Sequence, residues 1–207
     1  MGEGKPDGSF AMMLTFWFDV HSPWCFLAST RIQDIATKHG CELTWRPLHL
    51  PRLIEAIDGR RSLEENAAFV AWYKADLQDW AKRYGVTVKY HPKYPLRNSR
   101  ALRACLYAAD EGLAHQFVPR LLKAYWSEQA DITDLELFVR LAEETGLDAG
   151  HTRAAGLSEI MKARVGANTA EAIGRGVFGV PTIDTGEKLY FGNDRLEMLE
   201  HHLANRA

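Results

Sequence analysis

Ser22 lies where an apolar segment gives way to a second apolar stretch, within the run Ser22-Pro23-Trp24-Cys25. Serine is a favoured N-cap because its hydroxyl accepts from an orphan backbone N–H, and proline suits the first helical position. We therefore expect Ser22 at the N-terminus of a helix that follows a buried strand, where backbone N–H groups stabilise an anion or a thiolate. The alternative is that Ser22 is an ordinary helix cap.

A second candidate for chemistry is the Val180-Pro181 pair, which enters a short apolar stretch near the C-terminal end of the chain. In a fold that places this pair opposite Ser22, the Val180–Pro181 peptide is expected to be cis. The backbone N–H and C=O of Val180 would then be available to an extended, peptide-like ligand. The alternative is a proline that opens an edge strand.

A third candidate is the run Phe191-Gly192-Asn193-Asp194-Arg195, which leads from a predicted strand into a predicted helix. The free N–H groups of a helix N-terminus suit a carboxylate, and the Asp194 side chain suits an ammonium group. A γ-glutamyl group carries both of these charges. The alternative is a routine Asn or Asp helix cap.

The composition limits the partners of the protein. The 207 residues carry 25 Lys and Arg against 27 Asp and Glu, a formal charge of −2, which provides no strong field for nucleic acid or a membrane surface. Three cysteines, Cys25, Cys41 and Cys105, are too few and too widely spaced for a disulfide framework, so a cytoplasmic protein is expected. Residues 10–18 are apolar but lack a cleavage pattern, and we interpret them as a strand. No metal site is predicted.

The elements that must position these residues follow an α/β order. A near-continuous apolar strand is predicted at Leu14–Val20, a helix from Ser22 to about Gly40, and a strand at Cys41–Leu48, which together form a parallel βαβ unit. Strands at Pro181–Asp184 and Lys188–Phe191 flank a turn, and Asn193–Asp194 cap a final helix.

Almost everything between residues 51 and 176 is predicted to be helical. Capping-box patterns at Ser62-Leu63-Glu64-Glu65 and Thr133-Asp134-Leu135-Glu136 start two of the helices, and Ser158 starts another, running to Gly174. Asn98 or Ser99 caps a helix to Gly112, and Phe117–Trp126 is a further one. Between helices, residues 86–90 are predicted as a short extended piece and residues 91–96 as a loop.

This order predicts a thioredoxin-like βαβ–ββα core, residues 13–50 and 177–207, with a large all-helical domain, residues 51–176, inserted in the middle. In such a core Ser22 and Cys25 take the places of the two cysteines of Cys-x-x-Cys. Without the first thiol, dithiol–disulfide exchange is disfavoured, since the nucleophile is missing. A serine there still donates its hydroxyl hydrogen to an anionic sulfur that a ligand supplies.

The three motifs resemble those of the kappa-class glutathione transferase family, and within it those of the 2-hydroxychromene-2-carboxylate isomerases. The matching pieces are F-D-V-H-S-P-W at 18–24, Y-K-A-D-L-Q-D-W-A-K-R-Y-G-V at 73–86, G-V-F-G-V-P-T at 176–182 and F-G-N-D-R-L-E-M-L-E at 191–200. The piece at 73–86 is the most specific, because it lies in the helical insert, where no general thioredoxin rule requires it.

The resemblance implies glutathione as the cofactor and a small aromatic compound as the substrate, in a homodimer. It implies a glutathione-dependent cis–trans isomerisation of 2-hydroxychromene-2-carboxylate to trans-o-hydroxybenzylidenepyruvate through a thiolate adduct. Ser22 would contact the glutathione sulfur and Val180 its cysteinyl backbone. The γ-glutamyl end would be held by Phe191, Gly192, Asn193 and Asp194. Tyr94 would contact the substrate, with Arg97 and Asn98 nearby.

The chain departs from the family pattern at one position. A lysine expected after the second strand is replaced by Ile54, with Arg52 nearby, and Arg60 and Arg61 are the nearest candidates for an expected Asn-Arg pair. The substrate carboxylate is then gripped differently, or the substrate differs. A transferase, a disulfide oxidoreductase and a non-enzymatic interaction domain stay open as alternatives. Cys25 is a small buried hydrophobic residue, or a thiol open to mixed disulfides.

Overall fold

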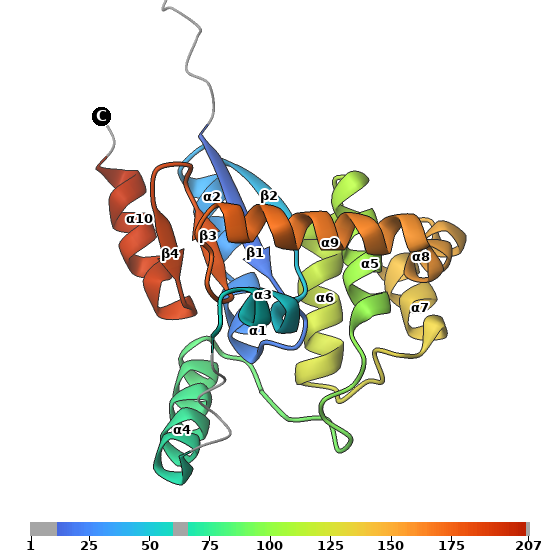
Figure 1. The fold of residues 1–207 in the computed structure, drawn as a ribbon, viewed down its shortest axis with the longest axis horizontal. Helices are drawn as coiled ribbons and strands as arrows, with labels where there is room; N and C mark the ends of the chain where they lie inside the picture. Colours follow the sequence, from blue (N-terminus) through green and yellow to red (C-terminus); the bar gives the residue numbers. More distant parts are fainter. Residues whose placement is uncertain (1–11, 60–65, 206–207) are drawn as a thin grey trace, which may run out of the picture.

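The computed structural model describes residues 12–59 and 66–205, and its centre is a four-stranded mixed sheet with the order β2-β1-β3-β4 (Figure 1). The strands are β1 (Met13–Phe18), β2 (Glu42–Pro47), β3 (Thr182–Asp184) and β4 (Leu189–Phe191). β1 pairs with β2 in parallel and with β3 antiparallel, and β3 pairs with β4 antiparallel. The predicted parallel βαβ unit and C-terminal hairpin are therefore confirmed.

The prediction of a single helix after Ser22 is wrong, because the structure has two helices there, α1 (Pro23–Ser29) and α2 (Ile32–Lys38). The hydroxyls of Ser29 and Thr30 donate to the carbonyls of Phe26 and Leu27, each at 2.7 Å. Such side-chain bonds compete with the backbone ladder and help to end a helix. α1 therefore stays short and packs tightly behind Ser22.

The middle of the chain is helical, as predicted. Its helices are α3 (Leu50–Ala56), α4 (Ala67–Arg83), α5 (Ser99–Asp110), α6 (Ala114–Trp126), α7 (Leu135–Thr145), α8 (Ala149–Leu157) and α9 (Glu159–Gly174). Figure 1 shows α4 at the lower left, apart from α5 to α8 at the right. No helix of the described part of the chain is long and apolar enough to cross a lipid bilayer.

Several predicted helix starts are corrected. Asn66 caps α4 by accepting from the amides of Ala68 and Phe69, whereas the pattern predicted at residues 62–65 lies outside the described residues, as do Arg60 and Arg61. Asp134, one residue after the predicted Thr133, caps α7.

The segment predicted as extended at residues 86–90 forms no strand. The Lys89 amide donates to the Trp126 carbonyl at 2.6 Å, which fastens the segment to the end of α6 instead. The C-terminal helix also starts differently, because the 3-10 turn η2 (Asn193–Arg195) precedes α10 (Leu196–Ala204) and no side-chain cap is formed there.

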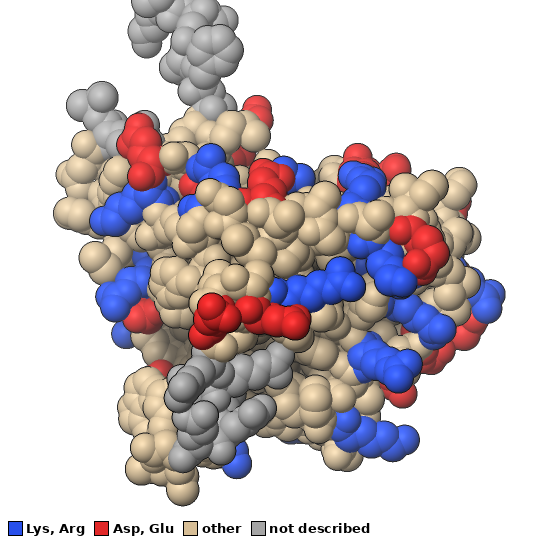
Figure 2. All heavy atoms as spheres, viewed as in Figure 1, with Lys and Arg blue, Asp and Glu red and all other residues tan. Residues whose placement is uncertain are grey.

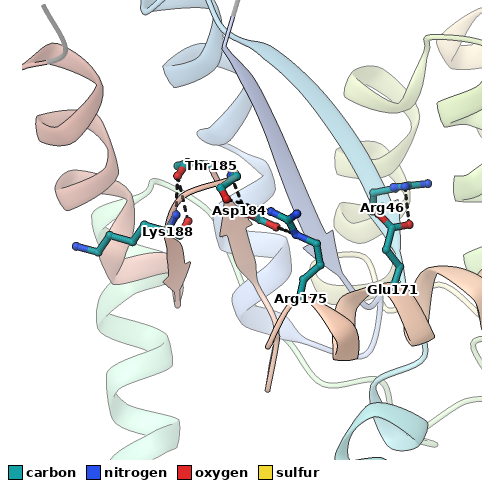
Figure 3. A network of polar contacts seen from close by, with 7 residues as sticks. Arg46, Glu171, Arg175, Asp184, Thr185 and Lys188 are labelled. Carbon is teal, nitrogen blue, oxygen red and sulfur yellow. Dashed lines mark hydrogen bonds and ion pairs between the residues drawn. The ribbon is translucent and has the colours of Figure 1, made fainter.

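The helix α9 ties the helical insert to the sheet. Figure 3 shows Arg46 of β2 paired with Glu171 at 2.7 Å, and Arg175, just after α9, paired with the buried carboxylate of Asp184 in β3 at 2.6 Å. The Asn168 amide adds a bond to the Pro47 carbonyl at 3.1 Å. The domain boundary at residues 176–177 stays a prediction. Across that boundary, α9 and the residue after it bond to β2 and β3, which belong to the predicted thioredoxin-like core.

The surface agrees with the balanced composition. In Figure 2 basic and acidic side chains are interspersed over the visible face. Several form pairs, such as Arg120 with Glu144 and Arg164 with Asp110. Such a surface provides no extended field of one sign on this face.

Candidate functional site

Ser22 and Val180, 158 positions apart in the chain, meet at the N-terminus of α1. The Ser22 hydroxyl accepts from the Cys25 amide at 3.3 Å and donates to the Val180 carbonyl at 3.4 Å, and the Ser22 side chain is buried. The Val180–Pro181 peptide is cis, as predicted from the sequence. Among the described residues, no hydrogen bond is made by the Val180 N–H.

A groove of about 370 Å³ lies beside this pair, and residues from each of the three predicted motifs line it, although Ser22 itself is not among them. It is lined by Trp24, Trp72, Tyr73, Asp76, Trp80, Val180, Pro181, Phe191, Gly192, Asn193 and Asp194. Its volume is in the range of small-molecule sites. The sheet side and the helix α4 therefore form two walls of one cleft. The sequence predicted that aromatic residues of the helical insert, Trp72 among them, cover the site, and Trp72 does line the groove.

The turn that holds Asn193 and Asp194 is fixed by its backbone. The Gly192 amide donates to the Pro181 carbonyl at 2.9 Å, and Gly192 has a φ of 106°, which residues with a side chain rarely adopt. A Cβ there would also collide with the Asp194 carboxylate. The Tyr84 hydroxyl donates to the Asn193 carbonyl at 3.2 Å, so α4 supports the turn from behind.

Two polar groups in the groove have capacity for a ligand. The side-chain nitrogen of Asn193 is buried and has no hydrogen-bond partner within the described part of the chain. The Asp194 side chain is 43% exposed and has one ion pair, with Arg195 at 3.7 Å. A buried donor without a partner is costly, so a ligand acceptor at this position would be favoured.

Sequence reasoning missed Asp76 of α4 as a site residue, although it lies within the matched piece at 73–86. Partial burial, and then the negative charges of Asp194 and Asp79, raise the pKa of the Asp76 carboxyl above its ordinary value. Two carboxylates that repel each other across a groove favour a cation between them. The sequence feature that could have indicated Asp76 is its place in residues 73–86, the most specific part of the family resemblance.

The environment of Cys25 favours the hydrophobic interpretation. Its side chain is fully buried, and this burial raises the pKa of the thiol to about 12, although the nearby Ser22 side chain opposes the shift. A thiol with so high a pKa is almost entirely protonated at neutral pH and is a poor nucleophile.

Asp19, which sequence reasoning did not select, holds the loop before Ser22. The carboxylate is fully buried and accepts from the amides of His21 and Leu50, each at 2.8 Å, and from the Asn98 side chain at 2.6 Å. Its backbone carbonyl accepts from the Ser22 amide at 3.1 Å. The sequence feature that could have indicated this role is an acidic residue directly after an apolar strand.

The predicted substrate contacts lie outside the groove. Asn98 does not cap α5 with its side chain, which is instead bonded to Asp19. Tyr94 lies beside His21, with 6.3 Å between ring centroids, and Arg97 is exposed. Arg52 is exposed on α3, with its guanidinium near Gly166 of α9. Their roles toward a substrate stay predictions.

The chain is similar to several known proteins. A family model described as a DsbA-like thioredoxin domain matches residues 13–204. A 2-hydroxychromene-2-carboxylate isomerase of Sphingobium xenophagum is 32% identical over 196 residues, covering 92% of this chain and 97% of the relative. A solved 2-hydroxychromene-2-carboxylate isomerase has a TM-score of 0.84 at 30% identity, covering 93% of this chain and 95% of its own. Glutathione S-transferase kappa 1 of Rattus norvegicus is 31% identical over 88 residues, 39% of each chain.

Proposed function

Since the chain belongs to the DsbA-like thioredoxin family, and within it to the 2-hydroxychromene-2-carboxylate isomerases, we propose that it is a glutathione-dependent isomerase. The proposed substrate is 2-hydroxychromene-2-carboxylate or a related intermediate of aromatic degradation. The observation that carries the proposal is the Ser22 hydroxyl facing Val180 beside a groove that also holds the Asn193-Asp194 turn.

Ser22 is the residue proposed to act on the sulfur. Glutathione, when bound, would supply a thiolate nucleophile. The 3.4 Å bond from Ser22 to the Val180 carbonyl is long, so the hydroxyl can turn its hydrogen to a nearby anionic sulfur at little cost. The Cys25 amide, which donates to the same oxygen, keeps Ser22 in place during this exchange.

The rest of the groove suits the remainder of a glutathione molecule. The Val180 N–H, which makes no hydrogen bond among the described residues, would pair with a peptide backbone, as in strand addition. Asp194 and Asp76 provide negative charge for an α-ammonium group, and the buried Asn193 amide provides a donor for a carboxylate or carbonyl oxygen. The residues present therefore fit the proposed cofactor.

Calorimetry with glutathione tests the proposal directly. We expect saturable binding below millimolar concentration, and weaker binding of ophthalmic acid, which has a methyl group where glutathione has its thiol. Cysteinylglycine, which lacks the γ-glutamyl group, should also bind more weakly, because Asp194 and Asn193 lose their partner. Absence of heat with millimolar glutathione would remove the basis of the proposal.

A kappa-like glutathione transferase is the second candidate, and the replacement of the expected lysine by Ile54 favours it. The two activities differ in whether glutathione is consumed. With the chromene carboxylate as substrate, an isomerase leaves the free thiol concentration unchanged and forms no product without glutathione. A transferase accumulates a stable conjugate and consumes one thiol for each substrate molecule.

We further propose that the protein is a homodimer, as the family resemblance implies. Multi-angle light scattering should give twice the 23.4 kDa chain mass. A monomer mass across the micromolar range contradicts this proposal and leaves the glutathione site untouched.

A further inference from the structure

Tyr84, the residue directly after α4, is held by contacts with three other residues. The Arg31 guanidinium lies over its ring, 4.7 Å from the centroid. The Trp80 ring meets it edge-on, with 5.5 Å between centroids. Its hydroxyl donates to the Asn193 carbonyl at 3.2 Å. Because a cation over an aromatic ring and an edge-on ring pair are both favourable, these contacts fix where the Tyr84 oxygen lies.

Arg31 belongs to the link between α1 and α2, where its amide donates to the Ala28 carbonyl at 3.0 Å. Arg31 and Tyr84 both line a second cavity of about 350 Å³, which lies between α2, the end of α4 and α10. Trp80 and Asn193, the other two residues in contact with Tyr84, line the groove instead. Tyr84 therefore connects the α1–α2 link to the wall of the groove.

The bond from the Tyr84 hydroxyl is one of two that hold the turn of Asn193 from outside. The other runs from the Gly192 amide to the Pro181 carbonyl at 2.9 Å. The turn is thus fastened to the sheet wall by one bond and to the end of α4 by the other. Its backbone sets the position of the buried side-chain nitrogen of Asn193, which has no partner in the described part of the chain. Since Asn193 lines the groove, the contact of a ligand with this nitrogen depends on how well the two bonds hold the turn.

We propose that Tyr84, held by Arg31, is a positioning residue that sets the selectivity of the groove for ligands with a γ-glutamyl group. This role rests on the proposed glutathione-dependent function, because the γ-glutamyl group is the part of glutathione assigned to Asn193 and Asp194. Tyr84 does not line the groove and acts through the turn. Burial raises the pKa of the Tyr84 phenol, so the hydroxyl keeps its hydrogen at neutral pH and remains a donor.

Calorimetry of the Tyr84→Phe variant with glutathione and with cysteinylglycine tests this role. The change removes only the hydroxyl, so the dissociation constant of glutathione should rise about threefold to tenfold, as for the loss of one neutral hydrogen bond. The dissociation constant of cysteinylglycine, which has no γ-glutamyl group to contact the turn, should stay within about twofold. Arg31→Met keeps an unbranched side chain beside the ring and removes the charge, and it should give a smaller loss for glutathione alone.

Two further variants show whether the selectivity depends on the Tyr84 hydroxyl itself. Tyr107→Phe removes the same oxygen from another half-buried tyrosine, beside His151, and should change neither dissociation constant. Arg83→Gln breaks the ion pair with Glu197 at the same end of α4 and should keep the ratio of the two dissociation constants. If Arg83→Gln changes this ratio as much as Tyr84→Phe does, the attachment of α4 in general sets the selectivity and the role of Tyr84 is wrong.

Ophthalmic acid, which keeps the γ-glutamyl group and lacks the thiol, separates this role from the proposed function. If the wild-type protein binds glutathione and Tyr84→Phe leaves the ratio of glutathione to cysteinylglycine affinity unchanged, the role of Tyr84 is wrong and the proposed function stands. If the wild-type protein binds ophthalmic acid as tightly as glutathione, the thiol is not recognised and the proposed function loses its basis. Weaker binding of ophthalmic acid by Tyr84→Phe then still supports the role of Tyr84, and equal binding overturns it. Absence of binding of both ligands by the wild-type protein overturns both proposals.

Discussion

The two walls of the groove are built in different ways. On the sheet side, α1 buries six of its seven residues and Ser22 sits at its buried end. On the other side, α4 buries only Leu77 and Ala81 of its seventeen residues, and Trp72 is 58% exposed. Figure 1 shows the same contrast, with α1 inside the molecule and α4 at its margin.

This difference in burial suggests two roles: the sheet wall holds the Ser22 oxygen in place, and the α4 wall selects the ligand. Ser22 is fixed by bonds to Asp19, to the Cys25 amide of α1 and to Val180, so its oxygen has little freedom. Side chains of α4 present aromatic and acidic groups with few buried contacts, and such regions carry less of the global stability. Changes on the sheet wall should therefore affect stability and rate together, whereas the main effect of changes on α4 should be on ligand affinity.

The largest effect is expected from Ser22→Ala. Loss of a donor to a developing anion costs roughly 10²–10³ in rate, while loss of the cap costs about 1 kcal/mol of stability. Glutathione-dependent turnover and thermal unfolding measure the two quantities. Ser29→Ala, at the other end of α1, removes only a bond to the Phe26 carbonyl and should keep activity. Full activity in Ser22→Ala would show that Ser22 is only a cap.

The next largest effect is expected from Asp19→Asn, as a loss of stability. An amide cannot accept from all three groups that donate to the carboxylate, and each buried donor left unpaired costs about 1–3 kcal/mol. Urea unfolding measures the loss. The double variant Asp19→Asn, Asn98→Asp reverses the pair and should recover part of it. An unchanged urea midpoint in the single variant would contradict the role of Asp19 in holding the loop.

A smaller, pH-dependent effect is expected from Asp76→Asn on α4. The folded protein raises the pKa of this carboxyl above its unfolded value near 3.8. The protonated carboxyl therefore stabilises the fold below pH 3.8, and this contribution is lost as the pH rises through the folded pKa. The variant avoids this loss and should be more stable than wild type at pH 7 but not at pH 3. Its glutathione affinity should fall up to about fivefold, as for an exposed ion pair.

Asp79→Asn is the matched control for this comparison. Asp79 also raises the pKa of Asp76 but does not line the groove, so the variant should keep glutathione affinity. An equal loss of affinity in both variants would mean that glutathione affinity depends on the net charge of α4 and not on the position of Asp76.

Trp72→Ala should change stability by no more than about 0.5 kcal/mol, because the side chain is mostly exposed. It should nevertheless weaken binding of an aromatic electrophile, since Trp72 lines the groove. Ile160→Ala, at an exposed site on α9, is the control with neither effect. A large drop in the unfolding temperature of Trp72→Ala would contradict the contrast between the two walls.

The last prediction is that the Cys25 thiol does not react with an alkylating reagent in the native protein. Because burial raises its thiol pKa to about 12, almost no thiolate exists at pH 8. Iodoacetamide labelling of the native protein, read by mass spectrometry, should modify the half-buried Cys41 before Cys25. Labelling of Cys25 at a rate similar to that of Cys41 would favour a reactive thiol on the sheet wall.

Local pattern accounts for much of what was predictable. The apolar run at β1, the Ser-Pro helix start and the Val180-Pro181 pair each carry their signal within a few residues, and the structure contains all three as predicted. Helix starts were less predictable. Thr133 has the right residue type for a cap, but its neighbour Asp134 caps α7, and α4 starts at a cap, Asn66, that the pattern did not indicate.

The sequence by itself determined the order of elements and the three motifs on the sheet wall, because strand periodicity and helix caps are properties of neighbouring residues. Tertiary structure decided which distant groups meet. Asp19 with Asn98, Asp76 with Asp194, and Trp24 with Tyr73 are separated by long stretches of chain, and no local pattern specifies such pairs. Only packing of α4 and α5 against the core brings them together, so the second wall of the groove emerges from the fold.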